Sequence, residues 1–570
     1  MTDSVSPVPH SELDEHFGPR KWDLGNEPPA DKALGVVVGG SLSKGLEVKL
    51  DRDTSTEETA VGRYVVVQGQ SRRFFSMITD VMLDATDPRW AKVAPDMSDD
   101  FMRDVMIGIN TFGLLHVSPM LMLEEGATET KPVKTVPGHF ARVVEATAED
   151  VNQIFGEEQP GYFFVGEPLD MDGIRIYLNL KRLVERSSGV FGKSGTGKTF
   201  LTRMLLAGII KENVAVNLVF DMHNEYGWKS QDEAKTEVKG LRQLFPSGKV
   251  AVVTLDPESS RRRGSKVDYD VTIGYDQLEP EDVAMLQSIM GLSDVQVGAL
   301  YAIHRRLGRN WIARLLNDER PEEMQDMIDS GLIHEGTLGA IQRKLRMFQR
   351  FGFLRPNVQD NVVEKLLGFI NQGVNVVLEF GRYGGSLEAY ILVANYLTRR
   401  IHQAYVERKE AAQGGGRDEP KPLVITIEEA HKFLDPAIAS QTIFGTIARE
   451  LRKYNVTLLI VDQRPSGIDP EVMSQIGTRV TCLLDDESDI RAVFSGVSGA
   501  SELRNVLAKL DTRQQALILG HAVPMPVVVR TRDTTSAAYY EALGYTEGDQ
   551  LQKKLEKNRK ALGRDDSGLG

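Results

Sequence analysis

Apolar and polar residues alternate in two different ways along the chain. From Leu34 to about Gly166, short β-type runs are separated by clusters of Gly, Asp, Ser and Pro, and this spacing predicts a small β-barrel or sandwich. From about Gly189 onward, short buried-type runs alternate with helical stretches, which is typical of parallel βαβ units. The pattern therefore predicts an α/β protein built from two different parts.

The runs predicted as strands can be stated by residue. In the first part they are Gly35–Gly39, Leu46–Leu50, Arg63–Gln68, Phe74–Val81 and Phe140–Glu145. The stretch 85–135 carries two Met-rich patches, and we expect an irregular or partly helical insertion there. In the second part the predicted strands are Ser188–Phe191, the run from Asn217, Ala251–Leu255, Val374–Phe380, Leu423–Ile427, Thr457–Val461 and Arg479–Leu484.

Breaks in these patterns divide the chain into six predicted segments. They are a flexible N-terminal arm at 1–31, the β-barrel at 32–166, the first part of the α/β core at 167–275, a helical insertion at 276–370, the second part of the core at 371–535 and a charged C-terminal tail at 536–570. The arm is rich in Pro, Asp, Glu and Ser, a composition typical of chain that does not fold by itself.

Composition narrows the function classes only a little. The 570 residues include 68 Lys and Arg against 81 Asp and Glu, so the net charge is −13. This acidity argues against a surface coated for nucleic-acid binding, although a few basic groups inside a channel remain compatible with it. The single cysteine, Cys482, excludes a disulfide framework. Without an apolar leader or spanning run, a cytoplasmic protein with no membrane contact is expected.

One motif carries specific chemistry. Residues Gly192–Thr199 read GKSGTGKT and fit G-x-x-x-x-G-K-[ST] in full, between a predicted strand and a predicted helix. The alternative, a Gly-rich turn that binds nothing, does not explain this context. Backbone N–H groups of such a loop surround phosphates, the Lys198 ammonium reaches the β- and γ-phosphates, and the Thr199 hydroxyl ligates Mg²⁺. The candidate ATP-binding residues are Gly192, Ser194, Gly195, Thr196, Gly197, Lys198 and Thr199.

Acidic and amide side chains follow other predicted strands. The run from Leu423 ends in Glu428 and Glu429, candidates for the Mg²⁺ sphere and for the general base respectively. An exposed acidic helix start is the alternative. Gln463 follows the next strand and is a candidate γ-phosphate sensor, with a simple loop amide as its alternative. A further strand is predicted to expose Asp221 and Glu225 near the nucleotide.

Two groups of basic residues have candidate roles. Arg449 and Arg452 lie three apart on one helical face. Either one, with Arg452 preferred, is a candidate finger that reaches the site of a neighbouring subunit, unless both form ion pairs within the chain. A loop after Ala251–Leu255 is a candidate DNA contact, with a solvated surface run as its alternative; its basic residues are Arg261, Arg262, Arg263 and Lys266.

Taken together, these motifs resemble those of HerA-type hexameric DNA translocases, relatives of the FtsK motor. The resemblance spans about residues 32–535. It rests on the phosphate loop and on the runs Asp221–Tyr226, Ile427–Phe433, Arg449–Tyr454, Asp462–Val472 and Gly520–Pro526. Two positions depart from the family pattern: Glu428 stands where Asp is usual, and Asp462 stands where Ser or Thr often precedes the Gln.

The resemblance implies more than the residues alone indicate. It implies an N-terminal β-barrel of the ATP-synthase type, a RecA-like P-loop ATPase core with a helical insertion, and a homo-hexamer around double-stranded DNA. It also implies ATP and Mg²⁺ as cofactors, and a NurA-like nuclease or another effector docked on the barrel. End processing in DNA repair and antiphage defence are the implied settings.

Two other functions remain open from sequence. A RecA-like ring can move protein instead of DNA, because the fold does not specify the polymer. An oligomeric scaffold that binds ATP and activates an effector is the second alternative. Zinc-protease and serine-hydrolase motifs are missing from the sequence, and no nuclease carboxylate cluster stands out.

Overall fold

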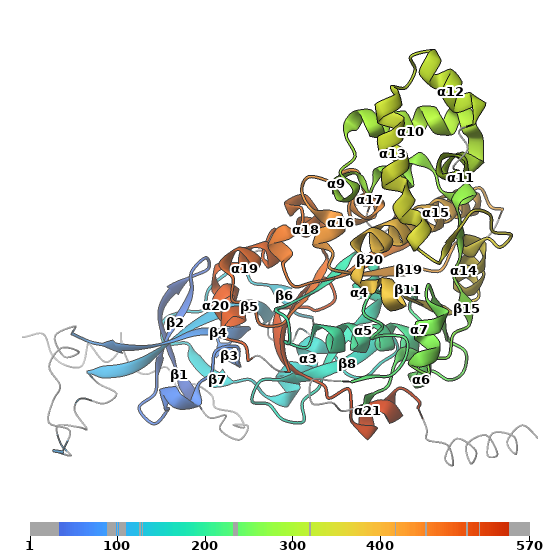
Figure 1. The fold of residues 1–570 in the computed structure, drawn as a ribbon. Coiled ribbons are helices and arrows are strands. Elements are labelled where there is room, and N and C mark those ends of the chain that lie inside the picture. Colours follow the sequence, from blue (N-terminus) through green and yellow to red (C-terminus); the bar gives the residue numbers. More distant parts are fainter. Residues whose placement is uncertain are drawn as a thin grey trace, which may run out of the picture.

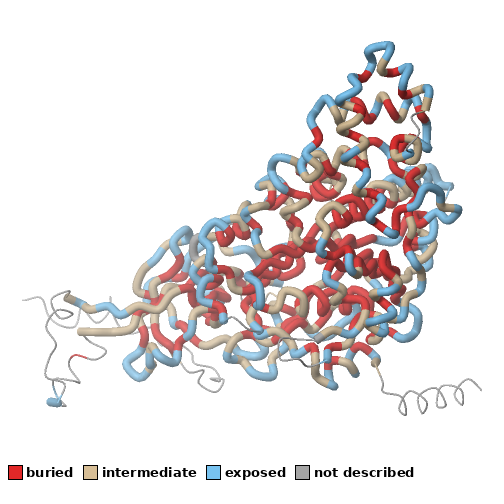
Figure 2. Tube along the Cα trace, in the orientation of Figure 1, coloured by how far each residue is buried: buried red, intermediate tan, exposed pale blue. Residues whose placement is uncertain are grey.

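The computed structural model describes residues 33–87, 98–99, 101, 106, 110–124, 127, 129–231, 237–317, 321–416, 418–450, 453–497, 500–511 and 514–545. The predicted arm at 1–31 lies outside these residues, as does most of the predicted tail. A β-barrel occupies one end of the molecule, a large α/β core the middle, and a helical lobe the other end (Figure 1). Buried residues concentrate in the core (Figure 2).

The barrel is a closed sheet of six strands. Its strands follow the order β2-β1-β7-β3-β4-β5, β5 pairs back with β2, and the short β6 extends from β5. Alternate side chains such as those of Leu46, Val65 and Leu115 fill the interior. The strand bounds are β1 Ala33–Ser41, β2 Gly45–Leu50, β3 Tyr64–Gln68, β4 Arg72–Ala85, β5 Thr111–Glu124, β6 Lys131–Pro132 and β7 Arg142–Glu145.

The expectation of an irregular insertion at 85–135 is wrong for its second half. Residues Thr111–Glu124 form β5, which pairs antiparallel with almost the whole of β4. The Met and Leu side chains that suggested irregularity alternate between the barrel interior and its outer face. Residues 88–97 and most of 100–109 lie outside the described part of the chain.

The core is built on one sheet of twelve strands, in the order β15-β14-β18-β11-β19-β20-β10-β21-β22-β23-β8-β9. The first eight run parallel, and β22, β23, β8 and β9 continue the sheet antiparallel. Their bounds are β8 Tyr162–Pro168, β9 Ile176–Asn179, β10 Ser188–Phe191, β11 Val216–Asp221, β14 Val250–Thr254, β15 Tyr269–Asp270, β18 Asn375–Glu379, β19 Leu423–Glu428, β20 Val456–Asp462, β21 Thr478–Thr481, β22 Gln515–Gly520 and β23 Val527–Thr531.

Helices cover this sheet. The long α15 is buried over most of its first half, and α5 is buried on nearly all sides, as expected for helices inside a large α/β domain. The predicted insertion at 276–370 extends too far, because α14 Val362–Asn371 packs against β18 of the core sheet. The other helices outside the helical lobe are α3 Ala148–Phe155, α4 Leu180–Glu185, α5 Lys198–Glu212, α6 Leu241–Leu244, α7 Pro257–Arg262, α15 Leu387–Gln413, α16 His431–Leu434, α17 Ile443–Glu450, α18 Pro470–Gln475, α19 Glu487–Val493, α20 Ala500–Ala508 and α21 Ala537–Ala542.

The predicted insertion forms the helical lobe at the top of Figure 1. Two short parallel strands, β16 Ile273–Gly274 and β17 Leu354–Arg355, pair where the chain enters and leaves the lobe. The buried Trp311 packs inside it and donates from Nε1 to the Leu278 carbonyl at 2.9 Å. Its helices are α8 Pro280–Ala284, α9 Gln287–Met290, α10 Asp294–Leu307, α11 Trp311–Leu316, α12 Glu322–Asp329 and α13 Glu335–Leu345.

Two further predicted segment boundaries differ from the elements that the structure forms. The boundary at 166 falls inside β8, which belongs to the core sheet, whereas the last barrel strand ends at Glu145. The segment 536–570 was predicted as a charged tail, yet it begins with the helix α21. Both differences arise because short elements at segment ends gain their stability from partners that are distant in sequence.

The barrel packs directly against the core. Tyr64 on β3 donates from its hydroxyl to the Pro526 carbonyl at 2.9 Å, and Lys509 forms an ion pair with Asp80 at 3.2 Å. Outer barrel side chains and core side chains share one hydrophobic cluster. In the part of the chain that the structure describes, no helix has both the length and the apolar character needed to span a bilayer.

Candidate functional site

The phosphate loop joins β10 to α5, as the motif predicts. Gly192, Gly195 and Gly197 have φ values of +152°, +78° and +95°, a region that favours glycine. A Cβ on Gly192 would lie 2.7 Å from the Cys482 Cβ, so a side chain does not fit there. The loop therefore has the backbone conformation that lets successive N–H groups face an anion.

Within the loop, polar groups bond to one another. The Lys198 Nζ donates to the Lys193 carbonyl at 2.8 Å, and the Thr196 hydroxyl donates to the same oxygen at 2.7 Å. Burial lowers the pKa of Lys198, while the nearby acidic groups, Glu429 and Asp462 among them, act in the opposite direction. The strand before the phosphate loop, β10, lies beside β20, and β20 lies beside β19, so Lys198 follows a strand in the same group as those that lead to these carboxylates.

Glu428 ends β19 as a buried carboxylate. Its Oε1 accepts from the Tyr226 hydroxyl at 3.0 Å, and its backbone bonds to the Tyr390 hydroxyl. Its Oε2 is buried and has no hydrogen-bond partner among the described residues. Burial, and then the charge of Asp221, raise the pKa of Glu428 well above its usual range. A buried carboxylate oxygen without a hydrogen-bond partner can accept from a water of a hydrated cation, so Glu428 and Thr199 remain the candidate Mg²⁺ residues. The burial of Glu428 argues against the alternative of an exposed helix start.

Glu429, the next residue, has a different environment. Its φ is +49°, and its carboxylate is accessible at the strand edge. The Gln463 Nε2 lies 3.3 Å from each of its two carboxylate oxygens. The structure therefore brings the predicted general base and the predicted sensor into contact.

Asp462 and His431 complete this group, although neither was predicted to have a role in it. Asp462 ends β20 with a fully buried side chain, and its carboxylate accepts from His431 Nδ1 at 3.0 Å. Chiefly through this hydrogen bond, Asp462 raises the pKa of His431. The His431 Nδ1 also lies 3.7 Å from Glu429 Oε2.

The prediction that Asp221 is exposed near the nucleotide is wrong. Its fully buried carboxylate accepts from the backbone N–H groups of Glu225 at 2.7 Å, Tyr226 at 2.8 Å and Gly227 at 3.2 Å. Burial, assisted by the charge of Glu379, raises the pKa of Asp221 to about 7. Asp221 therefore holds the turn after β11. Glu225 is half-buried beside this turn, and its charge contributes to the raised pKa of Glu428.

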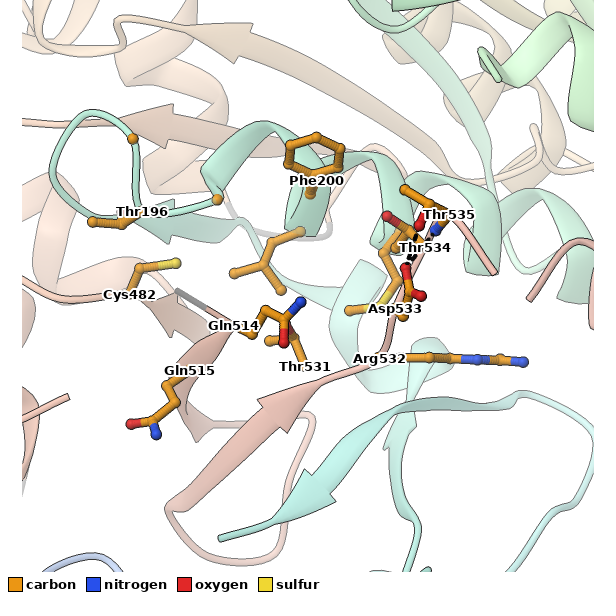
Figure 3. Close-up of a pocket in the computed structure, with 14 residues that line it drawn as sticks. Thr196, Phe200, Cys482, Gln514, Gln515, Thr531, Arg532, Asp533, Thr534 and Thr535 are labelled. Atoms are coloured by element: carbon orange, nitrogen blue, oxygen red, sulfur yellow. Dashed lines mark hydrogen bonds between the residues drawn. The ribbon is translucent and has the colours of Figure 1, made fainter. Parts of the chain in front are cut away.

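A cavity of about 300 Å³ opens beside the phosphate loop (Figure 3). Phe200, Leu201 and Met204 of α5 form its apolar wall, and Thr196 and Cys482 lie at its phosphate-loop end. Gln514 and the segment Thr531–Thr535 after β23 form the opposite, more polar wall. The sequence reasoning missed this wall, because the only available signal was its place after the last strand of the core.

Of the two candidate arginine fingers, the structure describes only Arg449. Arg449 forms ion pairs within the chain, with Glu471 at 3.3 Å and Asp469 at 4.0 Å. This is the alternative that the sequence left open. Arg452 lies outside the described residues.

Two of the four basic candidates for DNA binding lie on a helix instead of the predicted loop. Arg261 and Arg262 are exposed in the last turn of α7, and Lys266 is exposed beyond it. Arg263 instead forms an ion pair of 2.6 Å with the fully buried Glu379. The helix forms because Asp256 caps it and Pro257 occupies its first turn.

Comparison with known proteins agrees with this architecture. The family model of the helicase HerA central domain matches residues 163–401, and the HAS barrel domain model matches residues 34–91. A DNA double-strand break repair helicase HerA of Sulfurisphaera tokodaii is 23% identical over 529 residues, covering 87% of this chain and 92% of the relative. The chain belongs to the HerA family. A HerA of Saccharolobus solfataricus is 25% identical, covering 87% of this chain and 91% of that protein.

Partial similarity to solved structures was also found for this HerA-family chain. VirB4 of Thermoanaerobacter pseudethanolicus has a TM-score of 0.43 and 13% identity, covering 67% of this chain and 99% of VirB4. The plasmid coupling protein TrwB in complex with ADP and Mg²⁺ has a TM-score of 0.44 and 12% identity, covering 68% of this chain and 92% of TrwB.

Proposed function

We propose that this HerA-family ATPase is a translocase that uses ATP hydrolysis to move along double-stranded DNA in repair. The observation that carries the proposal is that a complete phosphate loop, Glu429 and Gln463 follow three neighbouring parallel strands of one sheet, with Gln463 in contact with Glu429. The near full-length similarity to proteins named as DNA double-strand break repair helicases supports DNA as the polymer.

In this proposal each residue has a distinct task. The backbone of the phosphate loop and Lys198 hold the ATP phosphates, and the cavity behind Phe200 holds the base and ribose. Mg²⁺, held from the Thr199 hydroxyl and the Glu428 side, neutralises phosphate charge. Glu429 accepts the proton of the attacking water, and Gln463 orients that water and the γ-phosphate.

The remaining parts of the proposal concern assembly. Six copies form a ring around DNA, Arg452 or Arg449 of one copy reaches the site of the next, and Arg261, Arg262 and Lys266 touch DNA phosphates without reading bases. A separate nuclease or other effector docks on the barrel, in DNA end processing or in antiphage defence. The exposed Leu83 and Phe140 of the barrel region, with 83% and 75% of their surface accessible, support such a contact.

The decisive experiment is steady-state ATP hydrolysis with and without linear duplex DNA. We expect strong stimulation by DNA, no hydrolysis by Lys198→Ala, and intact DNA after incubation with the protein alone. Hydrolysis that duplex DNA leaves unchanged would favour protein remodelling or an ATP-binding scaffold. DNA degradation that persists in Lys198→Ala would contradict the need for a separate nuclease.

A further inference from the structure

One buried carboxylate joins the two strand ends that carry the proposed reaction. Asp462 Oδ2 accepts from the His431 backbone N–H at 2.7 Å and from His431 Nδ1 at 3.0 Å, and Oδ1 accepts from the Arg464 backbone N–H at 2.7 Å. The first two donors belong to His431 at the start of α16, which follows β19, and the third lies in the loop after β20. Asp462 thus fixes the start of α16 and this loop relative to each other.

The proposed general base and the proposed sensor lie next to the residues that Asp462 holds. Glu429 is two positions before His431 and has a left-handed φ of +49°, a conformation that costs a non-glycine residue about 1 kcal/mol. It persists only where its surroundings hold it. Gln463 lies between Asp462 and Arg464, and its amide faces the Glu429 carboxylate at 3.3 Å.

The His431 ring separates two carboxylates that would otherwise repel each other. Ligand atoms of Glu429, His431 and Asp462 all lie within 4.8 Å of one another. With its proton on Nδ1, the ring donates to Asp462, and the same nitrogen lies 3.7 Å from Glu429 Oε2. This arrangement keeps Glu429 turned toward Gln463 and away from Asp462.

We propose that Asp462 and His431 form a positioning pair that holds the general base Glu429 and the sensor Gln463 in register for hydrolysis. The inference rests on the proposed ATPase function of the same site. In this proposal neither Asp462 nor His431 touches the nucleotide. Both act through Glu429 and Gln463.

The test separates catalysis from nucleotide binding. For Asp462→Asn and His431→Ala we expect basal kcat to fall about 10- to 100-fold, the size of effect that a small misplacement of reacting groups produces. The Kd for a fluorescent non-hydrolysable ATP analogue should stay within about twofold, because the phosphate loop and cavity are intact. His431→Gln keeps a donor in the side chain and should recover part of the kcat that His431→Ala loses.

A matched control is available in His521, which is similarly accessible and forms a 2.9 Å pair with Glu185 outside the strand-end cluster. His521→Ala should leave kcat unchanged. Unchanged kcat in both Asp462→Asn and His431→Ala would overturn the proposal, as would a loss of analogue binding that parallels the loss of kcat. If DNA fails to stimulate the wild type while these variants still lose basal kcat, the translocase function fails and the positioning pair stands.

Discussion

Glu428 and Glu429 are neighbours in sequence but have opposite surroundings. The end of β19 buries Glu428 against Tyr226, whereas the left-handed backbone of Glu429 turns the next carboxylate toward Gln463. Consecutive side chains of a strand point to opposite sides, and the change of backbone region at Glu429 adds to this difference. Two adjacent acids can therefore serve metal binding and proton transfer separately.

The cavity beside the phosphate loop gives a prediction at the same scale. Phe200→Ala removes the largest apolar side chain of the wall that faces Gln514. We expect the Kd for ATP to rise about tenfold, because stacking and burial of a base are worth about 1–3 kcal/mol. The affinity for inorganic triphosphate should not change, since it uses the phosphate loop alone. Isothermal titration with both ligands checks this, and an equal loss for both would show that the loop itself was disturbed.

The position of a site residue could be predicted where a local sequence motif determines it. It could not be predicted where hydrogen bonds and neighbouring strands of the folded chain determine it. The spacing of GKSGTGKT alone was enough to place Lys198 and Thr199 at the start of α5. The prediction for Asp221 failed because three backbone N–H groups of its own turn use its carboxylate, which no spacing reveals. The roles of His431 and Asp462 depend on two strands being adjacent, and the sequence does not specify which strands are neighbours.

At the scale of elements, the basic segment after β14 illustrates how a helix distributes its side chains. Because Pro257–Arg262 is helical, Arg261 and Arg262 point to solvent, while Arg263 turns back to Glu379. Glu379 is fully buried, and the hydroxyls of Ser260 and Ser265 are its other donors. A run of three arginines thus contains two surface residues and one structural residue.

This difference predicts that Arg263→Ala lowers stability, whereas Arg262→Ala weakens DNA binding. Arg263→Ala leaves the buried carboxylate of Glu379 without its cation and should lower the free energy of unfolding by about 2 kcal/mol. This is less than the roughly 3–5 kcal/mol lost when a fully buried pair is broken, because Arg263 is partly exposed. Urea denaturation measures this loss. Arg262→Ala should leave stability unchanged and weaken duplex DNA binding at low salt. A destabilised Arg262→Ala with normal Arg263→Ala would contradict the assignment.

Strand prediction succeeded where runs were short and uniformly apolar, as in the parallel strands of the core. It failed for β5, whose 14 residues mix Met, Leu, Gly and Pro. The long β4 provides the pairing partner that makes this segment a strand, and the closure with β2 fixes it in place. Barrel closure is a property of the whole sheet, so no local window contains it.

At the scale of the whole molecule, Lys198 is the only cation among the described residues that we assign to the phosphates. Arg449 is not assigned to them, because it pairs with Glu471 and Asp469. If Arg452 completes the site of a neighbouring copy, two different inactive chains can complement each other. Mixing Lys198→Ala chains with Arg452→Ala chains should restore part of the ATPase activity, since some interfaces then combine two intact halves. Mixtures that stay inactive after subunit exchange would place each complete site within one chain.

The C-terminal part of the described chain contributes both to the core sheet and to the cavity beside the phosphate loop. Strand β23 lies between β22 and β8, the strand that the chain enters after leaving the barrel and α3. The residues that follow β23 form the polar wall of the cavity (Figure 3). A premature stop codon or a protease cut after Gly520 would thus remove more than a dispensable terminus. One lesion would take away the sheet partner of β8 and one side of the nucleotide pocket together, so truncation alleles in this region should behave as complete losses of function.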